Sequence, residues 1–286
     1  MPDLYRQEIS RATPGCLVFL LDRSDSMKEQ WGQTGMTLAD GASAAINNLL
    51  WELSLMCTDR DGSHKHYFDI AVIGYGIRSD GQFGVESAFG GALAGRYLVS
   101  STDVAENPLG IREFQTPDGP VRKPVWVEPM HGYATPMCAA FDMAGSLVFD
   151  WVQQHPTSFP PVVFNITDGV VTDSPYSQPP ILAGDLVHQL KTLSTANGST
   201  LLFNVFLSPY ATVDRVFLPN TPQGLPVPGP EMFEWSSELP APMVEAAAGR
   251  LGISVAPGAR GLAFNAAPEQ LTNLLDIGSK PNKVGA

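Results

Sequence analysis

The stretch Cys16-Leu17-Val18-Phe19-Leu20-Leu21-Asp22-Arg23-Ser24-Asp25-Ser26 decides the fold that we expect for this chain. Its first part is a continuous apolar run, which is typical of a β-strand buried on both faces, as in a parallel sheet. The run ends at Asp22, and the small polar residues that follow are typical of a turn between a strand and a helix. We therefore expect Asp22 to lie at the carboxyl end of the first strand of a parallel sheet.

The segments after this stretch alternate between helix and strand patterns. From Leu38 to Met56 the apolar residues recur every three or four positions, which predicts an amphipathic helix. The same criteria predict further strands over 67–75, 161–167, 200–207 and 261–264, and further helices over 137–152, 181–193, 240–251 and 268–277. This alternation predicts an α/β fold with a doubly wound, mostly parallel central sheet, helices on both faces and one antiparallel edge strand.

Neither an internal repeat nor a second core is visible in the 286 residues, of which 44% are hydrophobic. We therefore expect a single domain over 1–286, with its core over about 12–278. Two segments fit the alternation poorly. We interpret 77–132 as an edge strand followed by a long excursion, and 208–230 as a proline-rich loop. The last helix is expected to be closed by Gly278.

The charge balance excludes some classes of partner. The chain has 17 Lys and Arg against 29 Asp and Glu, a formal charge of −12, and no basic patch, so we expect no nucleic-acid binding. No apolar stretch approaches the roughly 20 residues that cross a bilayer, so we expect no membrane association. The three cysteines, Cys16, Cys57 and Cys138, lie in apolar surroundings and are expected to be reduced core residues. These features together predict a cytoplasmic protein.

The first strand is followed by an Asp-x-Ser-x-Ser spacing at Asp22, Ser24 and Ser26. A carboxylate and two hydroxyls on one tight turn can point at a common centre, and oxygen ligands select hard cations such as Mg²⁺. The alternative is that these small polar residues only cap the next helix, as they often do in such loops.

A second apolar run, 162–166, also leads to an aspartate, Asp168. If the two strands are neighbours and parallel, both carboxylates lie at the same edge of the sheet. Thr135 comes just before a predicted helix that begins at that edge. The alternative for Thr135 is an N-cap followed by Pro136 at the first helical position.

The three motifs, Asp22-x-Ser24-x-Ser26, Thr135-Pro136 and Thr167-Asp168-Gly169, together resemble the von Willebrand factor A domain and its metal-ion-dependent adhesion site. The resemblance covers about 12–278. The tail formed by 259–265 and 274–278 is similar to that of cytoplasmic bacterial members of this family.

The resemblance implies a role for each matching residue. It implies that Ser24 and Ser26 ligate a metal directly, Thr135 directly or through water, and Asp22 and Asp168 mostly through water. The implied metal is Mg²⁺, or Mn²⁺ or Ca²⁺ in its place, with one position left for a carboxylate of a partner protein. The chain departs from the family in having Asp25 where glycine is usual. We expect Asp25 to face outward as a solvated carboxylate.

The function expected from these residues is that of a non-enzymatic, metal-dependent protein-interaction module. The resemblance further implies bacterial signalling or stress response, with a protein kinase or a metal-dependent protein phosphatase as the partner.

Two alternatives stay open at this point. One is a Mg²⁺-dependent phosphohydrolase, since aspartates at strand ends also hold cations in such enzymes. A haloacid-dehalogenase-like enzyme, however, needs a second aspartate at position 24, which is serine here. The other is a scaffold subunit with a vestigial metal site that interacts through 77–132 and 208–230.

Overall fold

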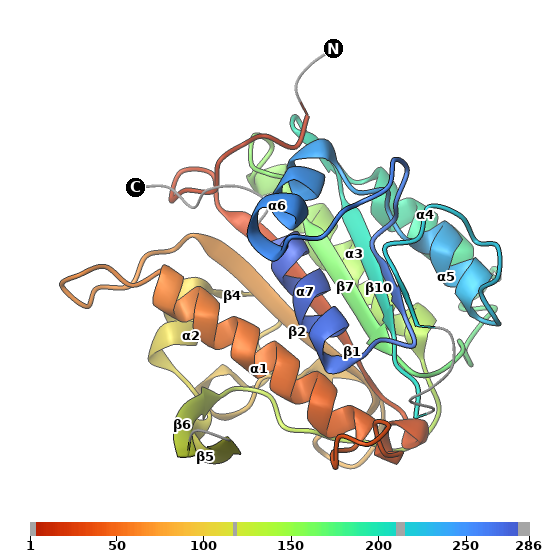
Figure 1. Ribbon diagram of the computed structural model, residues 1–286, viewed down its shortest axis with the longest axis horizontal. Helices are drawn as coiled ribbons and strands as arrows, with labels where there is room; N and C mark the ends of the chain where they lie inside the picture. Colours follow the sequence, from red (N-terminus) through yellow and green to blue (C-terminus); the bar gives the residue numbers. More distant parts are fainter. Residues whose placement is uncertain (1–3, 117–118, 210–214, 280–286) are drawn as a thin grey trace.

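The computed structural model describes residues 4–116, 119–209 and 215–279, and in these residues one eight-stranded sheet forms the centre of the molecule (Figure 1). Its strands are β1 (Gly15–Arg23), β2 (Phe68–Ile77), β3 (Phe83–Ser87), β4 (Val99–Ser100), β7 (Val162–Thr167), β10 (Leu201–Phe206), β11 (Val216–Phe217) and β12 (Leu262–Phe264). They are arranged in the order β11-β12-β10-β7-β1-β2-β3, and β4 also pairs with β2.

The strands β1, β2, β7, β10 and β12 are parallel to one another. The strands β3 and β4 are antiparallel to β2, and β11 is antiparallel to β12. The predicted fold class, a mostly parallel α/β sheet, is confirmed, and the predicted edge strand within 77–132 is β3. One antiparallel edge strand was predicted, but the sheet has antiparallel strands at both edges. The second one, β11, lies in the proline-rich segment, where no strand was predicted.

Helices cover both faces of the sheet. They are α1 (Leu38–Met56), α2 (Ser101–Glu106), α3 (Met137–Gln154), α4 (Ala183–Thr192), α5 (Gly229–Trp235), α6 (Ala241–Leu251) and α7 (Pro268–Ser279). In Figure 1, α1, α6 and α7 lie in front of the sheet, while α3 and α4 lie behind it. Helix α1 begins with a capping box in which Thr37 and Asp40 bond each other's backbone N–H groups.

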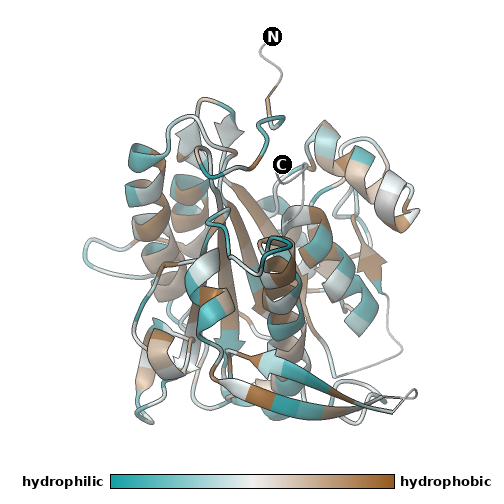
Figure 2. Ribbon diagram, turned by 90° about the vertical axis from the view of Figure 1, so that its left-hand side faces the viewer, coloured by the Kyte–Doolittle hydropathy of each residue, from teal (hydrophilic) through white to brown (hydrophobic). Residues whose placement is uncertain are grey.

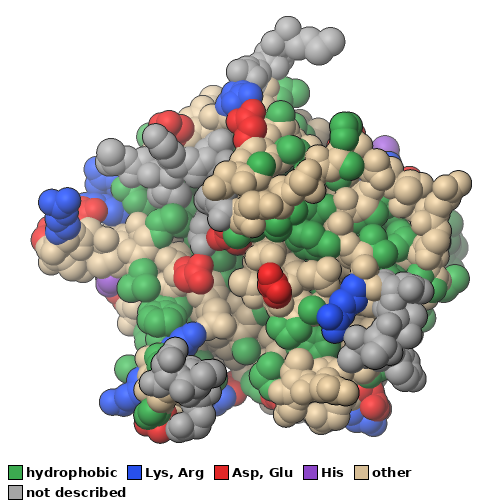
Figure 3. All heavy atoms as spheres, viewed as in Figure 1, with side chains coloured by type: hydrophobic (Ala, Val, Ile, Leu, Met, Phe, Trp, Pro, Cys, Tyr) green, Lys and Arg blue, Asp and Glu red, His purple; other side chains and the backbone are tan. Residues whose placement is uncertain are grey.

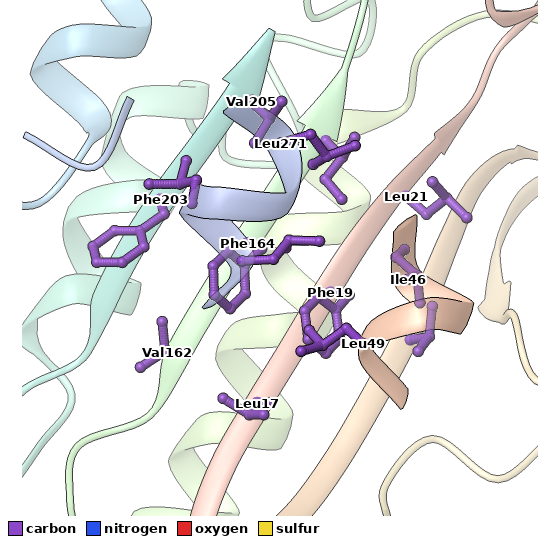
Figure 4. Packing of buried hydrophobic residues seen from close by; sticks show 14 of the residues in the cluster. Leu17, Phe19, Leu21, Ile46, Leu49, Val162, Phe164, Phe203, Val205 and Leu271 are labelled. Atoms are coloured by element: carbon purple, nitrogen blue, oxygen red, sulfur yellow. The ribbon is translucent and has the colours of Figure 1, made fainter. Parts of the chain in front are cut away.

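The core lies in two layers, one on each face of the sheet, and Figure 2 shows hydrophobic residues concentrated along the strands. In the front layer Phe19, Phe164 and Phe203 lie on neighbouring strands, with Leu271 of α7 above them (Figure 4). The rings of Phe19 and Phe164 are stacked with their centroids 5.1 Å apart, and Phe203 packs edge-on against Phe164 at 5.7 Å. Cys16, Cys57 and Cys138 are buried and unpaired, as predicted.

Gly278 has a different part in the fold from the one expected. It lies within α7, which continues to Ser279, so it does not end the helix. A Cβ atom at this position would lie 2.4 Å from the ring of Phe164. The missing side chain therefore allows α7 to pack closely on the centre of the sheet.

The segment 77–132 has regular structure of its own. After β3 come a 3₁₀ turn (Gly91–Leu93), β4, α2 and a hairpin of β5 (Gly110–Thr116) and β6 (Gly119–Val125) that lies off the main sheet (Figure 1). Asn47 of α1 anchors the end of the segment: its Oδ1 accepts from the N–H groups of Trp126 and Val127 at 2.8 and 3.1 Å. The excursion is thus held against α1 by a buried amide.

Of the proline-rich segment 208–230, residues 210–214 lie outside the described part of the chain, as do the ends of the predicted domain 1–286. A second short hairpin is formed by β8 (Ser194–Thr195) and β9 (Gly198–Ser199).

None of the described helices is both long enough and apolar enough to span a membrane. On the face shown in Figure 3, acidic and basic side chains are scattered rather than gathered in patches.

The packing of the three phenylalanines predicts a large cost for truncating the central one. We expect Phe164→Ala to lower the free energy of unfolding by about 3–5 kcal/mol, because it leaves a cavity between Phe19, Phe203 and α7. The control is Phe149→Ala on the outside of α3, where the ring is 52% exposed, and this change is expected to cost less than about 0.5 kcal/mol. Urea denaturation of both variants measures the difference, and equal midpoints would contradict this account of the core.

Candidate metal centre

The carboxyl ends of β1 and β7 bring the predicted site residues to one edge of the sheet. In the parallel register of these strands, Leu21 lies opposite Ile166. Asp22 and Thr167 come next on the two strands, and Asp168 follows directly after β7. The two carboxylates that the sequence places after separate buried runs are therefore neighbours in the structure.

Asp22 is almost completely buried, with 1% of its surface exposed. Both of its carboxylate oxygens accept hydrogen bonds. The backbone N–H of Ser24 donates to Oδ1 at 2.7 Å, and the hydroxyl of Thr167 donates to Oδ2 at 2.5 Å. These two bonds fix the orientation of the carboxylate.

The two serines connect Asp22 to Asp168. The hydroxyl oxygens of Ser24 and Ser26 lie 3.2 Å apart, and the hydroxyl of Ser26 donates to Oδ1 of Asp168 at 2.8 Å. Side chains from two loops thus form a continuous row of oxygens along the edge of the sheet, which we call the oxygen row: Asp22, Ser24, Ser26 and Asp168.

Thr135 reaches the same place from a third segment. A Cβ atom built on Gly169 would lie 2.9 Å from Oγ1 of Thr135 and 3.6 Å from Oδ2 of Asp22. The two side chains therefore lie against the same point of the backbone. Glycine at position 169 leaves room for Thr135 beside the oxygen row.

The alternative role of Thr135 as the N-cap of α3 does not hold. The residue at the N-cap is Pro136, which has no side-chain cap. The free N–H groups of Cys138 and Ala139 instead donate to the two oxygens of Asp173, each at 3.0 Å. A carboxylate from the loop after β7 therefore caps α3, and the Thr135 hydroxyl is not used for that purpose.

Asp25 faces outward, as predicted. It is the first residue of a 3₁₀ helix, η1 (Asp25–Lys28), and it forms an exposed ion pair with Lys28 at 2.6 Å. Its φ is not positive, so the backbone here does not require the glycine that is usual in the family. The N–H of Asp25 donates to the carbonyl oxygen of Tyr133 at 2.9 Å, which ties this loop to the one that carries Thr135.

Within the described residues, the carboxylates of this site lack a positive partner. Burial raises the pKa of Asp22 to about 7, and the nearby charge of Asp168 adds to the rise. Burial also raises the pKa of Asp168. Among the described residues, neither carboxylate forms an ion pair. A buried carboxylate of this kind is stabilised by taking up a proton or by a cation.

The spacing of the oxygens fits a small hard cation. Oxygens at about 2.1 Å from Mg²⁺ in an octahedron lie about 3 Å from their neighbours, and the hydroxyl oxygens of Ser24 and Ser26, the two expected direct ligands, lie 3.2 Å apart. The described residues contain no group of three His, Cys, Asp or Glu side chains suited to a metal. The site brings together two carboxylates and three hydroxyls instead, a donor set that suits Mg²⁺ better than Zn²⁺.

Three residues, Thr167, Gly169 and Asp173, have roles at the site that were not predicted from the sequence. Thr167 and Gly169 flank Asp168 in the motif and act on Asp22 and Thr135 as described above. Asp173 caps α3 across the loop. The Thr-Asp-Gly tripeptide in the sequence points to the first two residues as part of the site. No local pattern marks Asp173 as a helix cap, because the N-terminus of α3 that it caps lies more than thirty positions earlier in the chain.

Comparisons with known proteins give distant structural likenesses only. No protein-family model matches this chain, and no curated protein matches it significantly in sequence. The structure is similar to that of the manganese-loaded TRAP protein from Plasmodium vivax, with a TM-score of 0.36 and 14% identity over 70% of this chain and 59% of the other. It is also similar to the PilB minor pilin from Streptococcus sanguinis, with a TM-score of 0.45 and 10% identity over 94% of this chain and 61% of the other.

A third similar structure is the pilus adhesin RrgA from Streptococcus pneumoniae, with a TM-score of 0.33 and 14% identity over 96% of this chain and 38% of the other. This chain thus spans less than two thirds of the length of each of the three. The function proposed below rests on the residues of the site and not on these likenesses.

The raised pKa of Asp22 predicts an unusual pH dependence for the metal-free protein. The carboxyl has a pKa of about 7 when folded, against about 3.9 when unfolded. Between these values the folded chain holds a proton that the unfolded chain has released, so this group's contribution to stability is lost as pH rises toward 7. We expect Asp22→Asn to gain at least about 1 kcal/mol relative to the unsubstituted protein between pH 5 and pH 8.

Urea denaturation in EDTA at the two pH values measures this gain. Asp25→Asn, which changes an exposed carboxylate three positions along the same loop, is the control and should show no comparable gain. If the stability of Asp22→Asn runs parallel to that of the unsubstituted protein over this range, the Asp22 carboxyl is not the destabilising group that its burial indicates.

Proposed function

We propose that Asp22, Ser24, Ser26, Thr135 and Asp168 bind a divalent cation, Mg²⁺ or in its place Mn²⁺ or Ca²⁺. The observation that carries this proposal is the convergence of the buried carboxylate of Asp22, the half-buried carboxylate of Asp168 and three hydroxyls, from three segments, with no positive side chain of the described residues paired to either carboxylate. A cation supplies the charge that the carboxylates lack, and the spacing of the oxygens suits it.

In this proposal Ser24 and Ser26 are direct ligands, Thr135 is a ligand directly or through water, and the two aspartates act mostly through water. When bound, the cation supplies an electrophilic centre that can hold one further oxygen ligand from outside. The chain's own residues orient the donors. Thr167 holds the Asp22 carboxylate, and Asp173 takes over the capping of α3 so that Thr135 is left for the site.

We further propose that the ligand from outside is a carboxylate of a partner protein, so that this chain is a non-enzymatic protein-interaction module. The chain has a charge of −12, and an acidic group approaching the oxygen row would be repelled by Asp22 and Asp168 without a cation between them. The metal therefore makes binding of an acidic group conditional on its own presence.

The resemblance described above supports three finer proposals. They are a partner that is a protein kinase or a metal-dependent protein phosphatase, a role in bacterial signalling or stress response, and a cytoplasmic location. We also keep as a proposal that 1–286 forms a single domain.

The metal proposal predicts that Mg²⁺ or Mn²⁺ raises the thermal midpoint of the protein, because a ligand that binds only the folded state stabilises it. At a metal concentration of 100 times the Kd the gain is about 2.7 kcal/mol. We expect the double variant Ser24→Ala, Ser26→Ala to lose this gain. The exposed Ser194→Ala is the matched control and should keep it.

The same variants test the interaction proposal in pulldowns from the native host in Mg²⁺ or EDTA. A partner retained equally in EDTA would contradict a metal bridge. An assay with a generic phosphoester separates the enzyme alternative: metal-dependent turnover that is lost in Asp22→Ala would show a phosphohydrolase and not an interaction module.

A further inference from the structure

An apolar pocket of about 480 Å³ opens beside the proposed metal site, between β3 and α3. Its walls include Phe83 and Val85 of β3, Met143 of α3, and Pro136, which follows Thr135 directly. Asp173, the cap of α3, also lines it. The pocket and the oxygen row are therefore separated only by the start of α3 and its cap.

An exposed aromatic pair stands between the pocket and the metal loop. The rings of Phe83 and Tyr133 meet edge to face with centroids 6.0 Å apart, and the two side chains are 49% and 54% exposed. The carbonyl oxygen of Tyr133 accepts from the N–H of Asp25, and its hydroxyl donates to the carbonyl oxygen of Gly81 at 2.9 Å. These two bonds hold Tyr133 next to the loop of Ser24 and Ser26, and Phe83 packs against its ring.

The far side of the pocket is acidic. Asp142 is exposed on α3 and lines both this pocket and the neighbouring groove between α3 and α4. Within the described chain it accepts a hydrogen bond from the hydroxyl of Tyr176 at 3.3 Å and forms no ion pair. The exposed Asp150, by contrast, lines the adjoining groove but not this pocket. A cation on a partner is therefore the charge that complements this side.

We propose that the partner segment that gives its carboxylate to the metal also carries a large apolar side chain for this pocket and a Lys or Arg facing Asp142. This proposal rests on the proposed metal-dependent function and deepens it. The apolar side chain would displace water from the pocket and cover Phe83 and Met143. The partner segment is therefore apolar and basic except for the one acidic residue that binds the metal. The metal alone would not impose this composition, because it can bind a carboxylate whatever residues flank it.

Charge favours this class of partner over an acidic one. A segment with several carboxylates would be repelled by the −12 chain and by Asp142, and the metal could compensate for only one of them. Exposed aromatic and apolar side chains around a polar centre are also the usual anchors of a protein interface.

The experiment is selection from a phage-displayed library of random linear peptides, each with one fixed aspartate, on the full chain in Mn²⁺ and separately in EDTA. We expect the peptides that need the metal to be enriched in large apolar residues and in Lys or Arg near the aspartate. The two best peptides are then synthesised, and their Kd is measured by fluorescence anisotropy.

Two variants test the two contacts on the protein. Asp142→Lys, at an exposed position, and Met143→Glu, in the pocket wall, are each expected to weaken the synthetic peptides by about tenfold or more in Mn²⁺. Asp150→Lys makes the same charge change two turns along α3, away from the pocket, and is expected to weaken them much less. The Mn²⁺-induced rise in thermal midpoint, unchanged in all three variants, shows that the metal site and the fold are intact.

The outcomes separate this inference from the proposed function. If no peptide is enriched, or if the same peptides are enriched in EDTA, the metal-dependent function is contradicted and this inference falls with it. If peptides need the metal but show no apolar or basic preference, or bind Asp142→Lys and Met143→Glu as tightly as the unsubstituted chain, the function stands and this inference is wrong.

Discussion

The buried carboxylate of Asp22 is the constraint on which the site depends. It lies where β1 ends, between β2 and β7, and it is shielded from water by the strands on both sides. Two hydrogen bonds satisfy its oxygens, but hydrogen bonds do not supply the positive charge that a buried anion needs. Its raised pKa follows from this, as does the conclusion that a proton or a cation must accompany it.

The surrounding loops are organised so that other oxygens are available to that cation. Thr172 forms three hydrogen bonds with Thr135: its hydroxyl accepts from the Thr135 N–H and donates to the Thr135 carbonyl oxygen, and its own N–H donates to the same carbonyl oxygen. Asp173 caps α3. The loop after β7 is thus fastened to the start of α3 by both residues. Because Asp168 belongs to this loop and Thr135 to the other, these bonds hold a carboxylate and a hydroxyl from separate elements in a fixed relation. Such fixing of donors by their neighbours is what a selective metal site needs.

Much of the fold could be predicted because buried parallel strands leave a local signal. The apolar runs that end at Asp22 and at Asp168 marked both the strands and the polar residues at their ends, and parallel neighbours must end at one edge. The placement of those residues followed, whereas their role as ligands stays a prediction. Interactions between distant segments were not predictable. Gly278 has the sequence appearance of a helix stop, but its actual part depends on Phe164.

The cap on α3 and the structure within 77–132 were missed for the same reason. Asp173 follows the helix that it caps, so no capping pattern is visible in the sequence. Asn47 holds the excursion from α1, a segment far away in the chain. The periodicity of apolar residues shows which face of a single helix or strand is buried. It contains no information about contacts between residues far apart in the chain, such as those of Asp173 and Asn47.

The positive side chains closest to Asp22 in sequence are directed away from it. Arg23 is the next residue along β1, and since side chains alternate along a strand it points to the opposite face, where it pairs with Glu86 at 3.0 Å. Gly74 makes room for it, because a Cβ there would lie 2.6 Å from the Arg23 guanidinium. Lys28 is paired with Asp25. Both cations are engaged elsewhere, so neither of these two neighbours in the described chain neutralises Asp22. A proton or a bound metal ion can supply the compensating charge instead.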